Sequence, residues 1–189
     1  MCGFAGFVGE VENREQVLEN MIDTIIHRGP DSSGKFVDED AALGFRRLSI
    51  IDLSESGDQP LYNEDRSKVL VFNGEIYNYQ ELREELIQAG HTFVSNTDSE
   101  TLIHGYEQWG EELVYRLRGM YAFAIWDQKA KRLFSARDIF GIKPLYYAQM
   151  NGTLMFGSEI KSFLEHPKFD KVFNEDALGN YLSFQFVPT

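Results

Sequence analysis

The sequence is short of cysteine, of basic residues and of long apolar runs, and each shortage excludes a class of protein. One cysteine in 189 residues cannot form an intramolecular disulfide, so we expect a reducing, cytoplasmic setting. No apolar run reaches the roughly 18 residues that a membrane-spanning helix needs, and no basic-then-apolar leader is present. Lys and Arg number 18 against 30 Asp and Glu, and a formal charge of -12 repels phosphate backbones and anionic headgroups. We therefore expect no nucleic-acid partner and no membrane partner.

Internal repeats, low-complexity tracts and linkers rich in Pro, Gly and Ser are also missing. A chain of 189 residues, 43% of them hydrophobic, is long enough to bury one large core. We therefore expect residues 1–189 to form one domain.

Apolar spacing predicts three helices. Two of them cover residues 14–26 and 98–109, where apolar side chains recur at helical intervals. The third begins after Asn78, because Glu81 three residues on gives the pattern of a capping box. Asp98 would be the N-cap of the helix that it begins.

Short β-rich runs fill most of the remaining sequence, and a helix does not follow each strand. This order favours antiparallel sheets with helices packed against them, an α+β fold, over a parallel wound sheet. Asn151-Gly152 predicts a tight hairpin between the last two runs. The runs cover residues 42–51, 68–72, 120–126, 132–136, 145–148 and 153–156.

Cys2 is the first candidate for chemistry. A cysteine at position 2 becomes the N-terminal residue when Met1 is removed, and small second residues permit that removal. A free α-amine has a pKa of about 7.7 to 8.0, so near neutral pH it can accept the proton of the thiol. Nucleophile and base would then belong to one residue. The alternative is that Cys2 is a small buried apolar residue on a first strand.

Asn73-Gly74 follows an apolar strand, where this dipeptide usually marks a hairpin. The capping box at Asn78 leaves too few residues for a returning strand, so we predict a strand-to-helix loop. Such a loop can present the Asn73 amide and the Gly74 N–H together, two donors that would stabilise an oxyanion.

Two charged residues are candidates for binding a substrate. Arg46 and Arg47 lie in a mostly apolar strand, so one of them must point inward if its neighbour points out. An inward guanidinium matches a substrate carboxylate, although a solvated pair at a sheet edge is the alternative. Asp98 is either a plain helix cap or a carboxylate that binds a substrate ammonium.

We expect no metal site. The four histidines are not spaced as ligands in the sequence, and one cysteine offers no thiolate cluster. They are His27, His91, His104 and His166.

Taken together, these residues resemble the class II glutamine amidotransferases, and within them the asparagine synthetase branch. The likeness runs nearly end to end. Ile139 departs from it, since the family usually has proline there. The motifs that carry it are Cys2-Gly3-Phe4, His27-Arg28-Gly29-Pro30-Asp31, Arg47-Leu48-Ser49-Ile50-Ile51-Asp52, Gln59-Pro60-Leu61, Asn73-Gly74-Glu75-Ile76-Tyr77-Asn78, Asp98-Ser99-Glu100, Arg118 to Asp127, and Ala136 to Tyr147.

The resemblance implies a four-layer αββα sandwich of the N-terminal-nucleophile hydrolase kind and the hydrolysis of glutamine through a cysteinyl thioester. Cys2 would be the nucleophile, and Asn73 with Gly74 would form the oxyanion hole. Arg47 would hold the α-carboxylate of glutamine and Asp98 its α-ammonium. The pocket would be completed by Glu75 and by backbone atoms at Ile50 and Ile51.

The resemblance also implies partners that lie outside these residues. Residues 181–189 resemble the stretch that leads into an ATP-using synthetase domain, where ammonia would meet an activated aspartate. ATP and magnesium would bind only there, and a homodimer is possible. Three alternatives stay open: another class II branch, an enzyme that amidates a different carboxylate, and a domain kept for docking whose site is dead because Met1 is retained.

Overall fold

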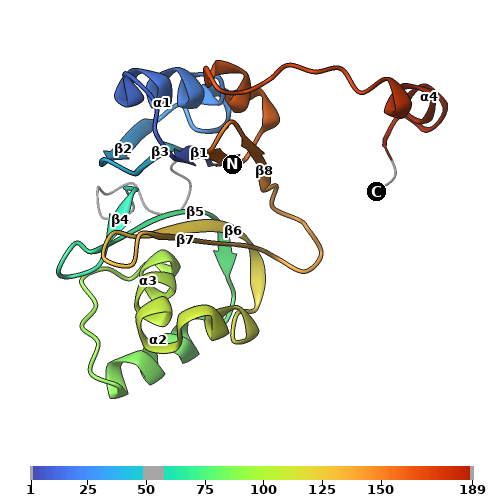
Figure 1. Ribbon diagram of the computed structural model, residues 1–189. Helices are drawn as coiled ribbons and strands as arrows, with labels where there is room; N and C mark the ends of the chain where they lie inside the picture. The colour runs from blue at the N-terminus through green and yellow to red at the C-terminus, as the bar shows by residue number, and fades with distance from the viewer. Residues whose placement is uncertain (1, 49–57, 188–189) are drawn as a thin grey trace.

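The computed structural model describes residues 2–48 and 58–187, and in them two antiparallel sheets lie face to face (Figure 1). The first sheet has, in spatial order, β2 (Ser32–Val37), β3 (Ala41–Arg47), β1 (Gly3–Val8), β9 (Thr153–Gly157) and β8 (Tyr146–Met150). The second has β4 (Leu61–Tyr62), β5 (Lys68–Ile76), β6 (Gly119–Asp127) and β7 (Arg132–Arg137).

Helices cover the outer face of each sheet, as Figure 1 shows. The first sheet carries α1 (Arg14–Asp23) and the 3₁₀ helix η4 (Ile160–Glu165), and the second carries α2 (Tyr79–Gln88), α3 (Asp98–Trp109) and η3 (Gly110–Tyr115). A short turn of 3₁₀ helix, η1 (Ile26–Arg28), follows α1, and α4 (Glu175–Phe184) stands apart from the layers. The architecture is therefore α+β, a four-layer αββα sandwich, which confirms the expected fold.

Successive side chains of a strand point to opposite faces of the sheet, and this alternation separates three apolar clusters, one between each pair of adjacent layers. On β5, Val69 and Val71 face the other sheet, whereas Leu70 and Phe72 pack under α3. On β1, Phe4 faces inward and Phe7 packs against α1. Because both faces of both sheets are buried, helices on the two outer faces are needed to complete the fold.

The strand β5 is longer than predicted, and this corrects the loop expected at Asn73-Gly74. Its pairing with β6 continues from Lys68 to Ile76, so Asn73 and Gly74 lie within the sheet. The partner strand β6 begins more than forty residues later in the chain, at Gly119. Local sequence signals could not reveal a partner so distant.

Asn78 is the N-cap of α2, as predicted, but without the expected side-chain bond, and the cap predicted at Asp98 was wrong. The Asn78 side chain makes no cap bond and instead bonds the 116–118 segment, where its Nδ2 donates to the Arg116 carbonyl at 2.9 Å. The N-cap of α3 is Thr97, so Asp98 is the first residue of the helix and its carboxylate is available to a neighbour.

The remaining predictions were mostly accurate to a few residues. The hairpin at Asn151-Gly152 is confirmed, with Met150 paired to Thr153. The helix expected over 14–26 ends at Asp23, and β2 and β4 were not predicted. The strand expected over 42–51 is β3, and its last three residues lie outside the described part of the chain.

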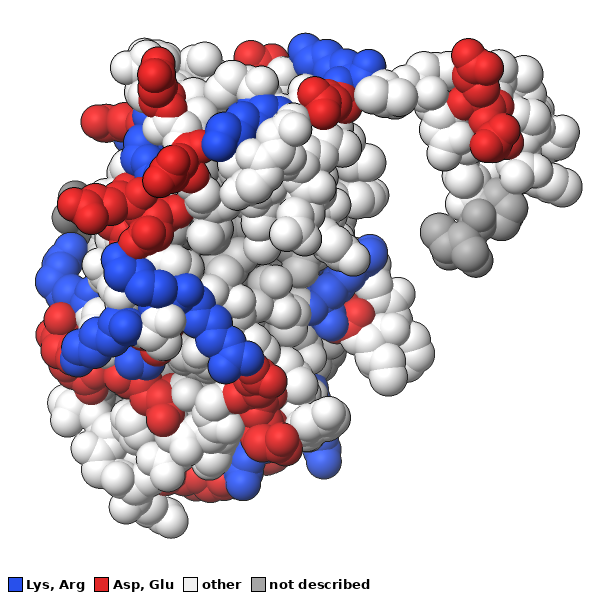
Figure 2. Space-filling model, in the orientation of Figure 1, with Lys and Arg blue, Asp and Glu red and all other residues white. Residues whose placement is uncertain are grey.

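Within residues 2–48 and 58–187, no helix is both long and apolar enough to cross a bilayer. On the face shown in Figure 2, basic side chains lie among acidic ones, and the projecting segment on the right exposes mainly uncharged atoms.

Candidate active site

Of the strands that carry apolar side chains into the space between the sheets, three have an inward row that ends in a polar residue. On β1 the row passes from Phe4 to Cys2, because alternate residues share a face. On β3 it passes from Phe45 to Arg47, and on β5 from Val71 to Asn73. The polar residues are Cys2, Arg47 and Asn73.

These three residues lie at one end of the layer. β1 and β3 are antiparallel, with Gly3 paired to Arg46, so the start of β1 meets the end of β3. The segment before β4 then joins the two sheets. In it, Asp58 accepts a bond from Arg47 Nη1 at 2.7 Å, and Gln59 binds the backbone N–H and carbonyl of Phe72, at 2.6 and 3.2 Å.

The Cys2 thiol is half-buried and lies against the backbone of Leu48. Its Sγ is 3.6 Å from the Leu48 carbonyl oxygen, and the Leu48 N–H donates to Sγ at 3.4 Å. On the other side, Arg28 Nε donates to the Cys2 carbonyl at 3.0 Å, and Arg28 is in turn paired with Glu159 at 3.0 Å. Contacts from two directions thus fix the residue that carries the thiol.

The two neighbouring arginines of β3 face opposite sides of the sheet, as predicted. Arg46 turns to the outer face, where its Nε donates to the Ile22 carbonyl at 3.2 Å and its Nη2 pairs with Asp23. Arg47 turns inward, is buried, and pairs with the half-exposed Asp58. Only Arg47 is therefore placed to meet a ligand between the sheets.

Asn73 is buried, and its amide nitrogen lacks a partner among residues 2–48 and 58–187. Its Nδ2 makes no hydrogen bond to any group in the described residues, although the side chain is only 3% exposed. Most buried amide nitrogens are paired, so an unpaired one indicates strain or a ligand. At the polar end of the layer, this donor is available to an oxygen atom.

The Gly74 N–H points to the edge of β5 that faces away from β6. Hydrogen-bonding groups alternate between the two sides of an antiparallel strand. The neighbouring N–H groups of Phe72 and Ile76 bond on that edge to Gln59 and Asp98. A Cβ at Gly74 would lie 2.3 Å from the Met120 carbonyl oxygen, so only glycine fits.

Asp98 connects the start of α3 to the end of β5. Its Oδ2 accepts the Ile76 N–H at 2.8 Å. Burial raises the pKa of Asp98 above its ordinary value, despite the opposing effect of that hydrogen bond. Glu75 lies two residues beyond Asn73 on the same face of β5 and is exposed. Ile50 and Ile51 lie outside the described residues.

Sequence reasoning gave no role to several residues that assemble this end of the layer. Arg28 was noticed only as part of a motif, yet it holds the Cys2 backbone. Ser158 exchanges two hydrogen bonds with the Phe4 backbone, at 2.8 and 3.1 Å, and so holds β1 in place. The contacts of Asp58 and Gln59 span the two sheets, which no local signal reveals.

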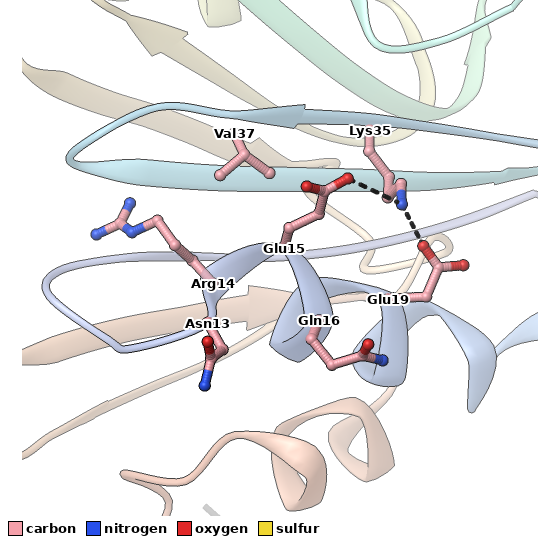
Figure 3. Close-up of a pocket in the computed structure, with 7 residues that line it drawn as sticks. All are labelled: Asn13, Arg14, Glu15, Gln16, Glu19, Lys35 and Val37. Atoms are coloured by element: carbon pink, nitrogen blue, oxygen red, sulfur yellow. Dashed lines mark hydrogen bonds and ion pairs between the residues drawn. The ribbon is translucent and has the colours of Figure 1, made fainter.

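Two hollows on the surface of the described residues lie outside the space between the sheets. One of about 330 Å³ is lined by Arg28, Tyr146, Ser158 and Glu159, next to the residue that holds Cys2. A larger one of about 620 Å³ lies at the start of α1 on the outer face of the first sheet (Figure 3). Lys35 in this second hollow is already paired with Glu19, so neither charge of that pair is left to bind a ligand.

Comparison with known proteins shows the family and the fold of the chain. A family model described as a glutamine amidotransferase domain matches residues 1–189. The chain belongs to that family. Among curated relatives, it is 48% identical over 193 residues to asparagine synthetase [glutamine-hydrolyzing] 1 of Bacillus subtilis and 44% identical over 186 residues to asparagine synthetase [glutamine-hydrolyzing] 2 of that organism. A maize asparagine synthetase [glutamine-hydrolyzing] is 44% identical over 167 residues.

The chain spans less than a third of these relatives. The three alignments cover 100%, 95% and 86% of this amidotransferase chain, but only 30%, 24% and 28% of the relatives. Among solved structures, the glutamine phosphoribosylpyrophosphate amidotransferase of B. subtilis superposes with a TM-score of 0.73 at 22% identity, over 86% of this chain and 43% of that one. An allosteric regulatory enzyme of purine biosynthesis gives 0.75 at 22%, over 87% and 43%. These two likenesses show the fold.

Proposed function

We propose that this domain hydrolyses glutamine to glutamate and ammonia, with Cys2 as the nucleophile. The observation that carries the proposal is the convergence of Cys2, Arg47 and Asn73 at one end of an otherwise apolar layer. A thiol, a buried cation and an unpaired amide donor together provide what amide hydrolysis of an amino-acid side chain needs.

The proposed reaction begins with removal of Met1, which frees the α-amine of Cys2. The amine takes the thiol proton, and Sγ attacks the carboxamide carbon to form a tetrahedral oxyanion. Asn73 Nδ2 and the Gly74 N–H donate to that oxyanion. The amine returns its proton to the leaving nitrogen, and ammonia departs as the C–N bond breaks. Water, deprotonated by the same amine, then cleaves the thioester to give glutamate and the free thiol.

The amino-acid end of the substrate would bind to charges that flank this centre. Arg47 would hold the α-carboxylate. This carboxylate would bind the guanidinium either together with the Asp58 carboxylate or in its place. Asp98, ionised, would hold the α-ammonium, and Glu75 with the backbone at Ile50 and Ile51 would complete the pocket. The charge pairing would orient glutamine with its carboxamide toward Cys2.

We further propose that residues 1–189 form one domain of a longer cytoplasmic protein, which uses the ammonia to make asparagine from aspartate. The curated relatives are named for that reaction, and each is at least three times as long as its aligned region. ATP and magnesium would bind in the other part of the protein. A thiol nucleophile also favours a reducing compartment, because the reduced form is the reactive one.

Two exposed apolar segments would contact that other part of the protein. Asp138 accepts the N–H groups of Ile142 and Lys143, at 2.9 and 3.0 Å, which closes the loop between β7 and β8. The loop thereby exposes Ile139 and Phe140, by 92% and 85%. On the projecting α4, the exposed apolar residues include Leu178, Tyr181, Leu182 and Phe184 (Figures 1 and 2).

The test is ammonia release from glutamine by Cys2→Ala. Alanine at position 2 still permits removal of Met1, so this variant keeps the α-amine and loses only the thiol. We expect no detectable release, while circular dichroism and the melting temperature match those of the wild type. Release at a rate near that of the wild type would refute the proposed function.

A further inference from the structure

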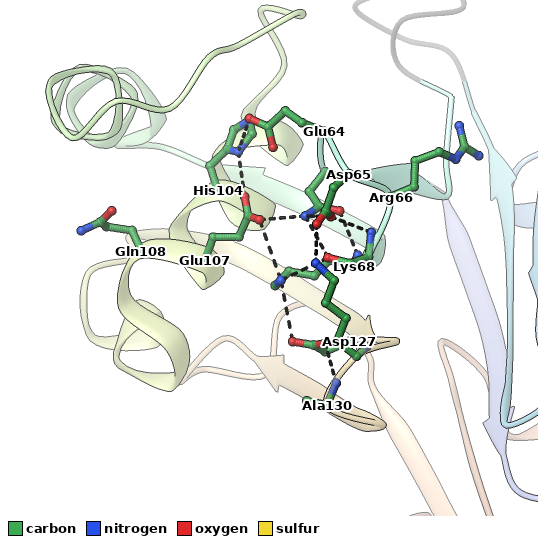
Figure 4. A network of polar contacts seen from close by, with 12 residues as sticks. Glu64, Asp65, Arg66, Lys68, His104, Glu107, Gln108, Asp127 and Ala130 are labelled. Atoms are coloured by element: carbon green, nitrogen blue, oxygen red, sulfur yellow. Dashed lines mark hydrogen bonds and ion pairs between the residues drawn. The ribbon is translucent and has the colours of Figure 1, made fainter.

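A second polar cluster, well away from Cys2 in the fold, lies where α3 meets the turn between β4 and β5 (Figure 4). His104, on α3, is 2% exposed and surrounded by three carboxylates. Its Nδ1 lies 3.2 Å from Glu107 and 3.8 Å from Glu64, and its Nε2 lies 3.5 Å from Glu100.

A second histidine reaches the same point from the segment after α2. The rings of His91 and His104 have centroids 5.2 Å apart, and His91 Nδ1 is 3.9 Å from Glu107 Oε2. Side-chain ligand atoms of Glu64, His91 and His104 all lie within 4.8 Å of one another. The fold thus brings together two histidines that stand thirteen positions apart in sequence, and it adds carboxylates from α3 itself and from the turn between β4 and β5.

We propose that His91, His104 and Glu64 bind a divalent transition-metal ion, zinc in the first instance, with Glu107 as the fourth ligand. Imidazole nitrogens and carboxylate oxygens are ligands that zinc accepts. Ligand atoms of a tetrahedral site with bonds of about 2.0 to 2.1 Å are about 3.3 Å apart. The observed separations of 3.2, 3.8 and 3.9 Å need only small side-chain movements to reach that value.

The charge balance of the cluster favours a cation. Glu64, Glu100 and Glu107 bring three negative charges, and Lys68 lies 3.8 Å from Glu107. Burial alone would lower the pKa of His104, but the carboxylates of Glu100 and Glu107 raise it to about 9. A proton on His104 therefore competes with the metal, and a bound metal ion must displace it from Nδ1.

Neighbouring side chains hold two of the proposed metal ligands, Glu107 and His91, in position. Glu107 Oε1 accepts Asn63 Nδ2 at 2.7 Å, and His91 Nε2 lies 3.2 Å from Gln108 Oε1, so two ligands have partners for their second polar atoms. Such outer contacts orient metal ligands. The ion would tie the turn after β4 to the helix that begins with Asp98, and its role would be to hold that helix in place.

The experiment titrates zinc into the full chain in the Cys2→Ala background, where no thiol competes. We expect one equivalent to bind by calorimetry, with a rise in melting temperature. Cobalt should give the visible bands of a nitrogen and oxygen site without a thiolate charge-transfer band. In ¹⁵N spectra of the histidine rings, His91 and His104 should shift and His166 should not.

Two variants and one control decide the outcome. His91→Ala and the exposed Glu64→Gln should each weaken zinc binding by at least tenfold, whereas His27→Ala, a histidine that also faces a carboxylate, should leave it unchanged. Melting curves without metal confirm that each variant is folded. Absence of a one-equivalent site in the parent chain, or unchanged affinity in both ligand variants, would overturn the proposal.

Discussion

The two ends of the layer between the sheets share the strands β3 and β5 yet differ in what fills them. At one end the layer is closed by Trp126, whose Nε1 donates to Asp38 at 2.8 Å, and Val69 and Ala41 pack beside it. At the other end the inward rows of β1, β3 and β5 carry Cys2, Arg47 and Asn73. The closed end supports stability, and the polar end gives up packing to place reactive groups.

After the loss of the Cys2 thiol itself, Arg47→Ala gives the largest effect that we expect at the polar end. Removal of one partner of a desolvated charge pair costs about 2 to 5 kcal/mol, so kcat/KM for glutamine should fall accordingly. The Arg47→Ala variant should also no longer discriminate against glutamine analogues that lack the α-carboxylate. Arg46→Ala is the matched control, because its guanidinium bonds α1 on the other face of the sheet. Equal losses in both variants would show that Arg47 has no special role in binding.

Leu43→Ala tests the closed part of the layer. Leu43 is fully buried on the inward face of β3, and such truncations cost about 2 to 5 kcal/mol of unfolding free energy. Chemical denaturation should show this loss. Kinetic constants of the folded variant should match those of the wild type, and a tenfold fall in kcat would contradict the division between the two ends.

Asn73→Ala should act on turnover. Loss of one oxyanion donor usually lowers kcat by about 10² to 10³, because its bond strengthens only as charge develops. The affinity for glutamine should stay nearly unchanged. A thiol-directed glutamine analogue that alkylates without a tetrahedral oxyanion should still label Cys2 in this variant. A variant that loses binding, or unfolds, would place Asn73 in the pocket or in the scaffold.

The smallest effect that we expect is a pH dependence at Asp98. Burial raises the pKa of Asp98, and only its ionised form attracts an ammonium group. Glutamine binding to the Cys2→Ala chain should therefore weaken as the pH falls through that raised pKa, and regain strength above it. In the Asp98→Asn derivative, binding should be weak at every pH. Persistence of the same slope in that derivative would assign the titration to another group.

The sequence was sufficient for the elements whose signals are local. Helical spacing located α3, and Asn151-Gly152 located a hairpin. Alternation along β3 indicated that the two arginines face opposite sides. The roles proposed for Cys2, Asn73 and Asp98 came from a family resemblance, which the family match over residues 1–189 supports as to family and fold.

What the sequence could not supply depends on contacts between distant segments. The extension of β5 to Ile76 needs β6 as its partner, and Gln59 meets Phe72 only because the two sheets pack. The pairing of His91 with His104 likewise arises from the packing of α2 and α3, whereas their sequence spacing led us to expect no metal site.

The most direct test of the central claim is the intact mass of the active protein, taken before and after treatment with a thiol-directed glutamine analogue. We expect a chain that lacks Met1 and gains one analogue at Cys2, with ammonia release lost in proportion to labelling. A fully active preparation in which every chain retains Met1, or in which labelled Cys2 leaves activity intact, would contradict the account.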